Sequence, residues 1–388
     1  MRIAHLHWAF PPIIGGVETH LVMLLPELVK KGHKVSLLTG TAEEAKVREN
    51  YKGVKVTRVP IMNLNWLNKR GLTGIEDEVR EEIAYFLDET KPDIVHAHNM
   101  HYFSKAHAKI LEEEARKKRK IPLVLTAHNS WDDMLFLELT KEIKWDHIIA
   151  VSFYIKKELM GIGCDSNQIT TIHHGIDIDK FKPTNKVEYK KRLIKLEKKR
   201  VIFHPARMGL AKGCDISVKA MRLVVKKFPK AILVLAGTKN IVDWSNSQQK
   251  DIAYIVDLIN NLGLKNNVFI EMFTLDEMQN LYAIAEVCLY PSSVGEPFGL
   301  TMLESLAAGK PMIVTNSGGM PEVIQDGING YVVPIRDYEA LANKITMLLG
   351  DENIKKRVGI TGRKIAELRF TKEIMAENNL KVYYKLLQ

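Results

Sequence analysis

Short apolar runs alternate with longer amphipathic segments along the whole chain. This alternation is the pattern of a parallel sheet covered by helices. In the first half, the apolar runs predict strands over residues 2–7, 34–38, 54–59, 94–96, 122–126 and 147–151. In the second half, they predict strands over residues 200–203, 231–236, 267–270, 287–290, 312–314 and 331–333. Two such sets of strands favour two doubly wound α/β sheets over a single barrel.

The helix expected between the first two strands covers residues 17–31 and ends at Gly32. Pro26 lies inside this segment and should kink it, because proline donates no backbone hydrogen bond. Residues 175–183 lie between the two sets of strands, and we interpret them as the linker between two domains. No low-complexity tract or short-period repeat interrupts the pattern.

The composition is that of a globular protein. The chain has 388 residues, 46% of them hydrophobic and 26% charged, which agrees with two domains and excludes disordered and fibrous classes. No apolar run approaches the roughly 18–20 residues needed to cross a bilayer. At the N-terminus, Trp8, Pro11 and Pro12 interrupt any signal-peptide core.

The cysteine pattern bears on the compartment. The three cysteines, Cys164, Cys214 and Cys288, are widely spaced and form no C-x-x-C pair. This usage favours a reducing compartment. We therefore expect a cytoplasmic protein.

The chain carries an excess of basic residues, with a formal net charge of +10. Such an excess favours anionic partners, which include nucleic acid, acidic lipid headgroups and phosphorylated small molecules. Much of the charge lies in mixed runs such as residues 112–120, which are typical of a solvated helix face. The basic stretches 116–120 and 190–200 also raise the alternative of peripheral association with an anionic membrane surface.

In doubly wound sheets, ligands bind beyond the carboxyl ends of the strands, where loops enter helices. The first such junction contains Gly15 and Gly16 directly before a helix. Two glycines let a backbone approach a ligand closely, and the helix N–H groups favour an anion; a plain tight turn is the alternative.

At the second junction, Arg207 and Lys212 could converge on one diphosphate, or they could be ordinary surface cations.

The third junction carries two carboxylates eight residues apart. Glu296 lies in the loop after the strand at 287–290, and Glu304 lies about one turn inside the following helix. The backbone N–H groups of residues 299–301 begin that helix and could hold a phosphate, while carboxylates suit sugar hydroxyls as acceptors. This arrangement could bind a nucleotide sugar at both ends; ordinary helix-start acids are the alternative.

The fourth junction places His128 just past an apolar strand in the first half. A structural and a catalytic histidine fit this position equally well.

Two further patterns imitate metal sites. We expect the imidazoles of His96 and His98 to lie on opposite faces of their strand, so that these residues and His101 form no joint metal site. The pair Asp177 and Asp179 lies in the proposed linker, and we expect no metal there either.

The stretch 295–311 resembles the Glu-x7-Glu signature of retaining GT-B glycosyltransferases, which form glycosyltransferase family 4, also called glycosyl transferases group 1. The resemblance extends over nearly the whole chain. Its further motifs, in chain order, are Gly15-Gly16-Val17-Glu18, Gly32-His33-Lys34-Val35, residues 92–98, His128, His174-Gly175-Ile176-Asp177, Arg207 with Lys212-Gly213, residues 317–322 and residues 326–330.

The resemblance implies a GT-B fold, in which two Rossmann-like domains face each other across a donor-binding cleft. Residues 1–175 would form the acceptor-binding domain, with a C-terminal helix at about 372–388 packed back on it. Residues 176–371 would form the nucleotide-sugar donor domain.

The resemblance also implies roles for single residues. Arg207 and Lys212 would neutralise the donor diphosphate, Glu296 would contact the hexose, Glu304 would hold the ribose, and His128 would lie beside the reacting sugar. The expected donor contacts are Gly15, Gly16, Arg207, Lys212, Glu296, Phe298, Gly299, Leu300, Thr301 and Glu304. The expected catalytic residues are His128, Glu296, Arg207 and Lys212.

By the same resemblance, the reaction retains the anomeric configuration and needs neither a metal ion nor a cofactor. The partners would be a UDP- or GDP-linked hexose and a glycan, lipid-linked or small-molecule acceptor. Members that make glycogen or starch commonly carry a lysine where this chain has Ile13-Ile14, which argues against them.

Some positions depart from the family pattern. Many members have asparagine at the place of His174, and a Gly-Phe or Gly-Tyr pair at the place of Met272-Phe273. The segment 238–244 lacks the usual Gly-Pro turn. These changes leave the choice of nucleotide open between UDP and GDP.

Two other function classes account for part of the sequence pattern. A nucleotide-sugar epimerase can share the fold, but it would need other acids and bases than the pair Glu296 and Glu304. A basic nucleic-acid-binding protein would explain the charge, but no base-stacking aromatic run or helix-turn-helix pattern supports it. We therefore expect no nucleic-acid partner.

Overall fold

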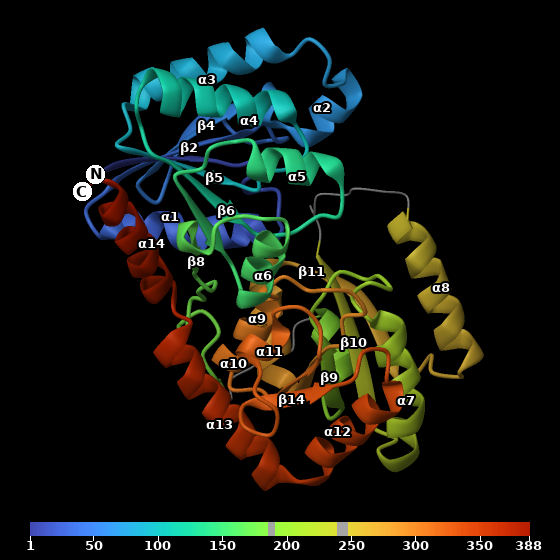
Figure 1. Ribbon diagram of the computed structural model, residues 1–388. Helices are drawn as coiled ribbons and strands as arrows, with labels where there is room; N and C mark the ends of the chain where they lie inside the picture. Colours follow the sequence, from blue (N-terminus) through green and yellow to red (C-terminus); the bar gives the residue numbers. More distant parts are fainter. Residues whose placement is uncertain (185–190, 239–246) are drawn as a thin grey trace. The chain divides into compact units, whose positions relative to one another are not determined.

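The computed structural model describes residues 1–184, 191–238 and 247–388 (Figure 1). The chain divides into two compact units, which are described separately below. The first unit is Met1–Gly175 together with Lys372–Gln388, and the second is Ile176–Thr371. Most of the atypical segment 238–244 and Lys190 of the basic stretch lie outside the described residues.

The first unit is built on an eight-stranded sheet of order β3-β4-β2-β1-β5-β6-β7-β8. Its strands are β1 Arg2–Leu6, β2 Lys34–Gly40, β3 Arg48–Tyr51, β4 Val54–Val59, β5 Ile94–His98, β6 Leu123–Ala127, β7 His147–Ala150 and β8 Ile169–Thr171. All neighbours pair in parallel except β3, which is antiparallel to β4. The sequence prediction of six strands missed β3 and β8, because β3 is a polar edge strand and β8 has only three residues.

Helices cover this sheet. They are α1 Gly16–Lys30, α2 Leu64–Arg70, α3 Glu76–Thr90, α4 Lys105–Leu111, α5 Met134–Lys141, α6 Phe153–Gly161 and α14 Lys372–Leu386, with a π-helical turn at Glu112–Lys118 and short 3-10 turns at Pro60–Met62 and Ser166–Gln168. The helix α1 continues through Pro26 to Lys30, and Gly32 follows with a φ of +86°.

The C-terminal helix belongs to the first unit. Figure 1 shows α14 beside α1, and both contribute to one apolar core with the central strands. Leu24 and Leu28 of α1 share this core with Met375 and Tyr383 of α14. The chain therefore leaves the first unit near Gly175 and returns to it at Lys372.

The second unit is built on a six-stranded parallel sheet of order β11-β10-β9-β12-β13-β14. Its strands are β9 Arg200–His204, β10 Ala231–Thr238, β11 Val268–Phe273, β12 Ala285–Tyr290, β13 Met312–Thr315 and β14 Gly330–Val333. Its helices are α7 Cys214–Lys227, α8 Ser247–Asn261, α9 Leu275–Ile284, α10 Leu300–Ala307, α11 Met320–Val323, α12 Tyr338–Gly350 and α13 Glu352–Arg369, and a 3-10 turn spans Lys191–Leu196. Each predicted strand of this half is confirmed within a few residues at its ends.

The two strand orders decide which loops can share a site. In parallel sheets, all carboxyl ends of the strands lie at one edge. In the second unit, β9, β12 and β13 are consecutive neighbours, so the loops that follow them lie side by side. In the first unit, β1, β5 and β6 are consecutive in the same way. The predicted fold class of two doubly wound α/β units is confirmed.

Candidate active site

The loops after β9 and β12 approach each other closely at Gly213. This glycine has a φ of +73° and precedes α7. A Cβ atom placed on it would lie 1.9 Å from the carbonyl oxygen of Pro291, so only glycine fits. Nearby, the N–H of Ser293 donates to the carbonyl of Ala211 at 2.9 Å. The close approach holds Lys212 against the loop that carries Glu296.

Lys212 and Glu296 form an ion pair at this place. The Lys212 Nζ donates to Glu296 Oε2 at 2.7 Å, and the hydroxyl of Tyr290 donates to the same oxygen at 2.6 Å. The Lys212 Nζ also lies 5.6 Å from the centre of the Tyr290 ring. Burial opposes the charge of Lys212, but the oxygens of Tyr290 and Glu296 outweigh it and raise the pKa of Lys212 above its usual range. The ammonium group is therefore charged at any physiological pH.

A third loop, after β13, positions the backbone of Glu296. The N–H of Gly319 donates to the Glu296 carbonyl at 2.8 Å. Gly318 has a φ of +55°, and a Cβ atom there would lie 2.1 Å from that same carbonyl oxygen. In addition, the hydroxyl of Thr315 donates to the Ser292 carbonyl at 2.7 Å. Gly318, Gly319 and Tyr290 were absent from the predicted site residues, although a Gly-Gly pair three residues after the end of a strand was a usable signal.

The helix α10 begins at the end of the Glu296 loop. Its N-cap is Gly299, with a φ of +84°, and no side chain of the described residues caps the helix. The first N–H groups of a helix have no partner inside it, so those of Leu300 and Thr301 point out of the helix end. The Thr301 hydroxyl oxygen is buried and has no hydrogen-bond partner among the described residues. Phe298, just before the cap, is buried.

Glu304 lies one turn inside α10, as predicted. Its Oε2 accepts a hydrogen bond from the hydroxyl of Tyr282 at 2.6 Å. Burial raises the pKa of Glu304 to about 7, although the hydrogen bond from Tyr282 favours the charged form. Near neutral pH this carboxyl group therefore exists in both protonation states. Tyr282 was not predicted as a site residue, and nothing in the local sequence marks it.

Arg207 is placed differently from Lys212. It lies in the loop after β9 and is exposed. Its guanidinium makes no hydrogen bond or ion pair to any other residue within 1–184, 191–238 and 247–388. The loop after β9 therefore carries Arg207, which is exposed, and Lys212, which is paired with Glu296.

In the first unit, Gly15 and Gly16 differ in what surrounds them. A Cβ atom on Gly15 would lie 2.3 Å from Oε2 of Glu18, whose Oε1 bonds to the Nε2 of His7 at 3.0 Å. A side chain at position 15 would therefore displace the carboxylate at the end of the Glu18 side chain. Gly16, the first residue of α1, has open space where a side chain would be.

His128 follows β6 and is buried. Its N–H donates to Asn99 Oδ1 at 2.9 Å, and its Nε2 bonds to His98 Nδ1 at 3.1 Å. The Nδ1 of His128 is buried without a hydrogen-bond partner in the described part of the chain. Burial lowers the pKa of His128 well below its ordinary value, so the ring is neutral.

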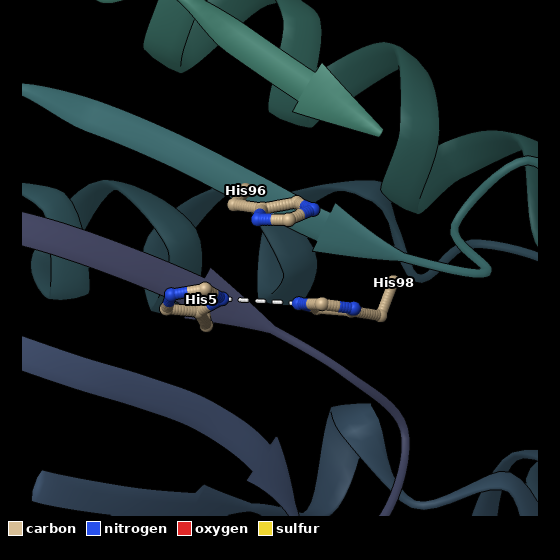
Figure 2. Close-up of side chains that lie close together, drawn as sticks. All are labelled: His5, His96 and His98. Carbon is tan, nitrogen blue, oxygen red and sulfur yellow. Dashed lines mark hydrogen bonds between the residues drawn. The ribbon is translucent and has the colours of Figure 1, made fainter. Parts of the chain in front are cut away.

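The expectation that His96 and His98 lie on opposite faces of their strand is wrong. Their rings are stacked, with centroids 4.3 Å apart and planes 26° apart, and Figure 2 shows both beside His5. The reason is the two-residue period of a strand, which places residues i and i+2 on the same face. His101 instead bonds to the carbonyl of Asn129 at 3.1 Å.

The other predicted decoy, Asp177 and Asp179, has a local explanation. The Oδ1 of Asp177 accepts the backbone N–H groups of Asp179 and Lys180, both at 3.1 Å. Asp177 therefore caps a turn at the start of the second unit. Among the described residues, neither aspartate belongs to a group of three potential metal ligands.

The basic stretch 116–120 is largely paired with acidic side chains. Arg116 bonds to Asp146 at 3.0 Å, Lys118 to Glu114 at 2.6 Å, and Arg119 to Glu114 at 2.7 Å. Such pairs leave little net charge for an anionic surface. Among the described residues, no helix combines the length and the apolar character needed to span a membrane.

Two family models match consecutive parts of the chain and together cover most of it. Residues 14–180 match the model described as Glycosyltransferase Family 4, and residues 185–365 match the model described as Glycosyl transferases group 1. The chain belongs to the group 1 glycosyltransferases. This glycosyltransferase is 27% identical to an uncharacterized glycosyltransferase of Methanocaldococcus jannaschii, over 99% of this chain and 98% of the relative.

Solved structures show that this glycosyltransferase has the GT-B fold. Sucrose-phosphate synthase of Thermosynechococcus elongatus matches with a TM-score of 0.83 and 21% identity, over 99% of this chain and 98% of that one. Anabaena HepE in complex with UDP-glucose matches with a TM-score of 0.79 and 19% identity, over 99% of each chain. The predicted family and fold are thereby confirmed.

Proposed function

We propose that this glycosyltransferase transfers a hexosyl group from a UDP- or GDP-linked sugar, with retention of the anomeric configuration, to a glycan, lipid-linked or small-molecule acceptor. The second unit would bind the donor and the first unit the acceptor. The observation that supports this most strongly is the convergence of three loops after β9, β12 and β13 on Lys212, Glu296 and the N-terminus of α10.

The donor diphosphate would bind to Arg207, Lys212 and the first N–H groups of α10. Arg207 is exposed and makes no ion pair to a described residue, so its fork of donors is available for two phosphate oxygens. Lys212 supplies a second charge, already oriented by Glu296 and Tyr290. The uncapped start of α10 adds backbone donors and the positive end of a helix dipole.

The two carboxyl groups would bind the sugar hydroxyls of the donor, Glu296 at the hexose and Glu304 at the ribose. Lys212 and Tyr290 bond to Oε2 of Glu296. The second oxygen, Oε1, can accept hydrogen bonds from sugar hydroxyl groups. Glu304 lies on the same helix whose N-terminus would hold the phosphate. Phe298 packs in the core behind this helix start and would position it.

The chemistry of transfer explains why cations are needed here. Breaking the bond between the sugar and the nucleotide produces an oxocarbenium-like sugar and a diphosphate with growing negative charge. Preorganised cations and amide dipoles aimed at that charge stabilise the transition state most. Fixed cations can do this in place of a divalent metal, so we propose transfer without metal or other cofactor. The roles of His128 at the reacting sugar and of Gly16 at the phosphate stay predictions.

The nucleotide base remains a choice between uracil and guanine, and UDP has the better support. HepE, which shares the fold, binds UDP-glucose. At the end of β11, this chain has the exposed Met272 and the buried Phe273 where a glycine and an aromatic residue are usual. A nucleotide-sugar epimerase is the second candidate, and it differs in requiring no acceptor.

The experiment is a panel of UDP- and GDP-sugars tested by thermal shift, followed by product analysis with candidate acceptors. A donor that binds the folded state raises the melting temperature by mass action. Lys212→Ala should abolish the shift, while Lys219→Ala, which removes a cation of α7 paired with Asp215, should keep it. Sugar release or isomerisation without an acceptor would favour the epimerase instead.

A further inference from the structure

The first unit holds a group of buried histidines that the proposed transfer uses only at His128. His20 lies on α1, His98 at the end of β5, and His128 just after β6. Their exposed fractions are 4%, 0% and 4%. Each offers a nitrogen, and these three nitrogens lie within 4.8 Å of one another. His5, His96 and His98 form a second such group (Figure 2).

The ring geometry distinguishes the two groups. A tetrahedral zinc ion holds imidazole nitrogens at 2.0–2.1 Å, which places ligand nitrogens roughly 3.3 Å apart and ring centroids roughly 5.2 Å apart. In the group of His20, His98 and His128, the centroid distances are 5.6, 4.8 and 5.4 Å, and the ring planes are inclined at 57°, 75° and 35°. The three centroid distances lie on both sides of the expected value.

The second group fits an ion less well. The ring of His96 is stacked on that of His98, with planes 26° apart, so the in-plane lone pairs of these two rings run nearly parallel instead of converging on one point. In addition, both nitrogens of His96 are already bonded, to the hydroxyls of Tyr383 and Thr126, each at 2.6 Å.

Of the nitrogens that an ion at the first group would use, one has no partner and two are bonded to each other. The Nε2 of His20 is buried without a hydrogen-bond partner in the described ranges. The His98 Nδ1 and His128 Nε2 form a hydrogen bond at 3.1 Å, which an ion would replace, and two ligands of one ion lie only slightly farther apart. The remaining nitrogens of two rings bond to other histidines: His20 Nδ1 to His174 Nδ1 at 2.8 Å, and His98 Nε2 to His5 Nδ1 at 3.0 Å. These two histidines occupy the place of the outer partner that orients a metal-bound histidine, which is usually a carboxylate, a backbone carbonyl or water.

We propose that His20, His98 and His128 bind one divalent transition-metal ion of the zinc class through three nitrogen ligands, leaving one position for an exogenous ligand. Nitrogen ligands select zinc, nickel or copper over magnesium and calcium, which prefer oxygen. The site stands on the first unit alone and does not depend on the proposed transferase reaction. If that reaction uses His128, a bound ion would occupy the side chain of this residue. Zinc would then inhibit transfer.

The test is zinc binding to the untagged full chain, measured by calorimetry and by metal analysis after dialysis, with magnesium as the comparison ion. We expect one zinc per chain and no magnesium. Replacing zinc by cobalt(II) should give the intense visible absorption of a four-coordinate site, which needs no mutant. No stoichiometric zinc binding, or binding of magnesium with the same affinity, would overturn the proposal.

Three variants locate the ion. His20→Gln should lower zinc affinity by at least about 100-fold, since even losing an outer partner costs 10–100-fold. His107→Gln is the matched control, because His107 is a buried histidine of the same unit bonded to Ser104 and Ile61 instead. His96→Gln should leave zinc affinity unchanged, and loss of binding there with retention in His20→Gln would assign the ion to the other group and refute the proposal. Thermal unfolding confirms that each variant is folded.

Discussion

The Nζ of Lys212 lies 2.7 Å from Oε2 of Glu296, across 84 positions of sequence. The family resemblance implied that these two residues bind different parts of the donor, the lysine the diphosphate and the glutamate the hexose. Their contact means that the position of the cation depends on the carboxylate. Removing Glu296 should therefore affect phosphate binding as well as sugar binding.

The two cations of the β9 loop should each be needed for transfer. Arg207→Ala or Lys212→Ala should remove roughly 2–4 kcal/mol of transition-state stabilisation, about 10²–10³-fold in rate. Steady-state kinetics with the identified donor measure the loss, and Lys219→Ala on α7 serves as the control. Near-native turnover in either variant would remove that residue from the proposed role.

Glu304 should make the stability depend on pH. Its pKa is about 7 in the folded chain against an ordinary value of 4.5, so the folded state binds the proton more tightly than the unfolded state. Stability should then fall as pH rises from about 4.5 to 7 and stay level above that, by at most about 3 kcal/mol.

Urea unfolding across this pH range tests the assignment. Glu304→Gln should remove this decrease of stability with rising pH, because an amide does not titrate in this range. Glu339→Gln, at an exposed position in the first turn of α12, should leave the fall unchanged. The same pH profile in wild type and Glu304→Gln would show that another group is responsible.

Transfer should not need a divalent metal. If Arg207, Lys212 and the amides of α10 stabilise the leaving diphosphate, then activity after treatment with EDTA should not fall below that before it. Activity that disappears with EDTA and returns with manganese would refute the metal-free mechanism. An increase after EDTA would agree with an inhibitory ion at His128.

Replacing Gly213 should lower the stability of the fold far more than replacing another glycine with a similar positive φ. Gly213→Ala must shift the loop, because its Cβ would lie 1.9 Å from the Pro291 carbonyl oxygen. We expect a loss of about 3–5 kcal/mol, the range for a severe steric change. Gly263→Ala has a similar φ of +68° but open space around it, and should cost about 1–2 kcal/mol. Equal losses in chemical denaturation would mean that the loop contact is unimportant.

Membrane association can be tested by flotation with anionic vesicles at low and high salt. The pairing of Arg116, Lys118 and Arg119 with acidic side chains reduces the charge that this stretch can offer. We therefore expect Lys118→Ala to change vesicle binding little. Binding at low salt that depends on Lys118 would show that these ion pairs open at a lipid surface.

The two-unit α/β fold could be predicted without the structure, because a buried parallel strand must be largely apolar and leaves a visible run in the sequence. It missed β3, whose edge position allows polar residues, and β8, which is too short to leave a run. Glu296, Glu304, Arg207 and Lys212 could be located as candidates because each follows a predicted strand. That His96 and His98 lie on the same face of their strand could also have been deduced from the two-residue period of a strand.

Which of these residues lie in contact became clear only from the folded chain. The contact of Lys212 with Glu296 follows from the adjacency of β9 and β12, and the support by Gly318 follows from the adjacency of β12 and β13. The bond of Tyr282 to Glu304 and the convergence of His20, His98 and His128 join separate elements in the same way. Strand order arises from packing between distant segments, and local periodicity carries no information about it.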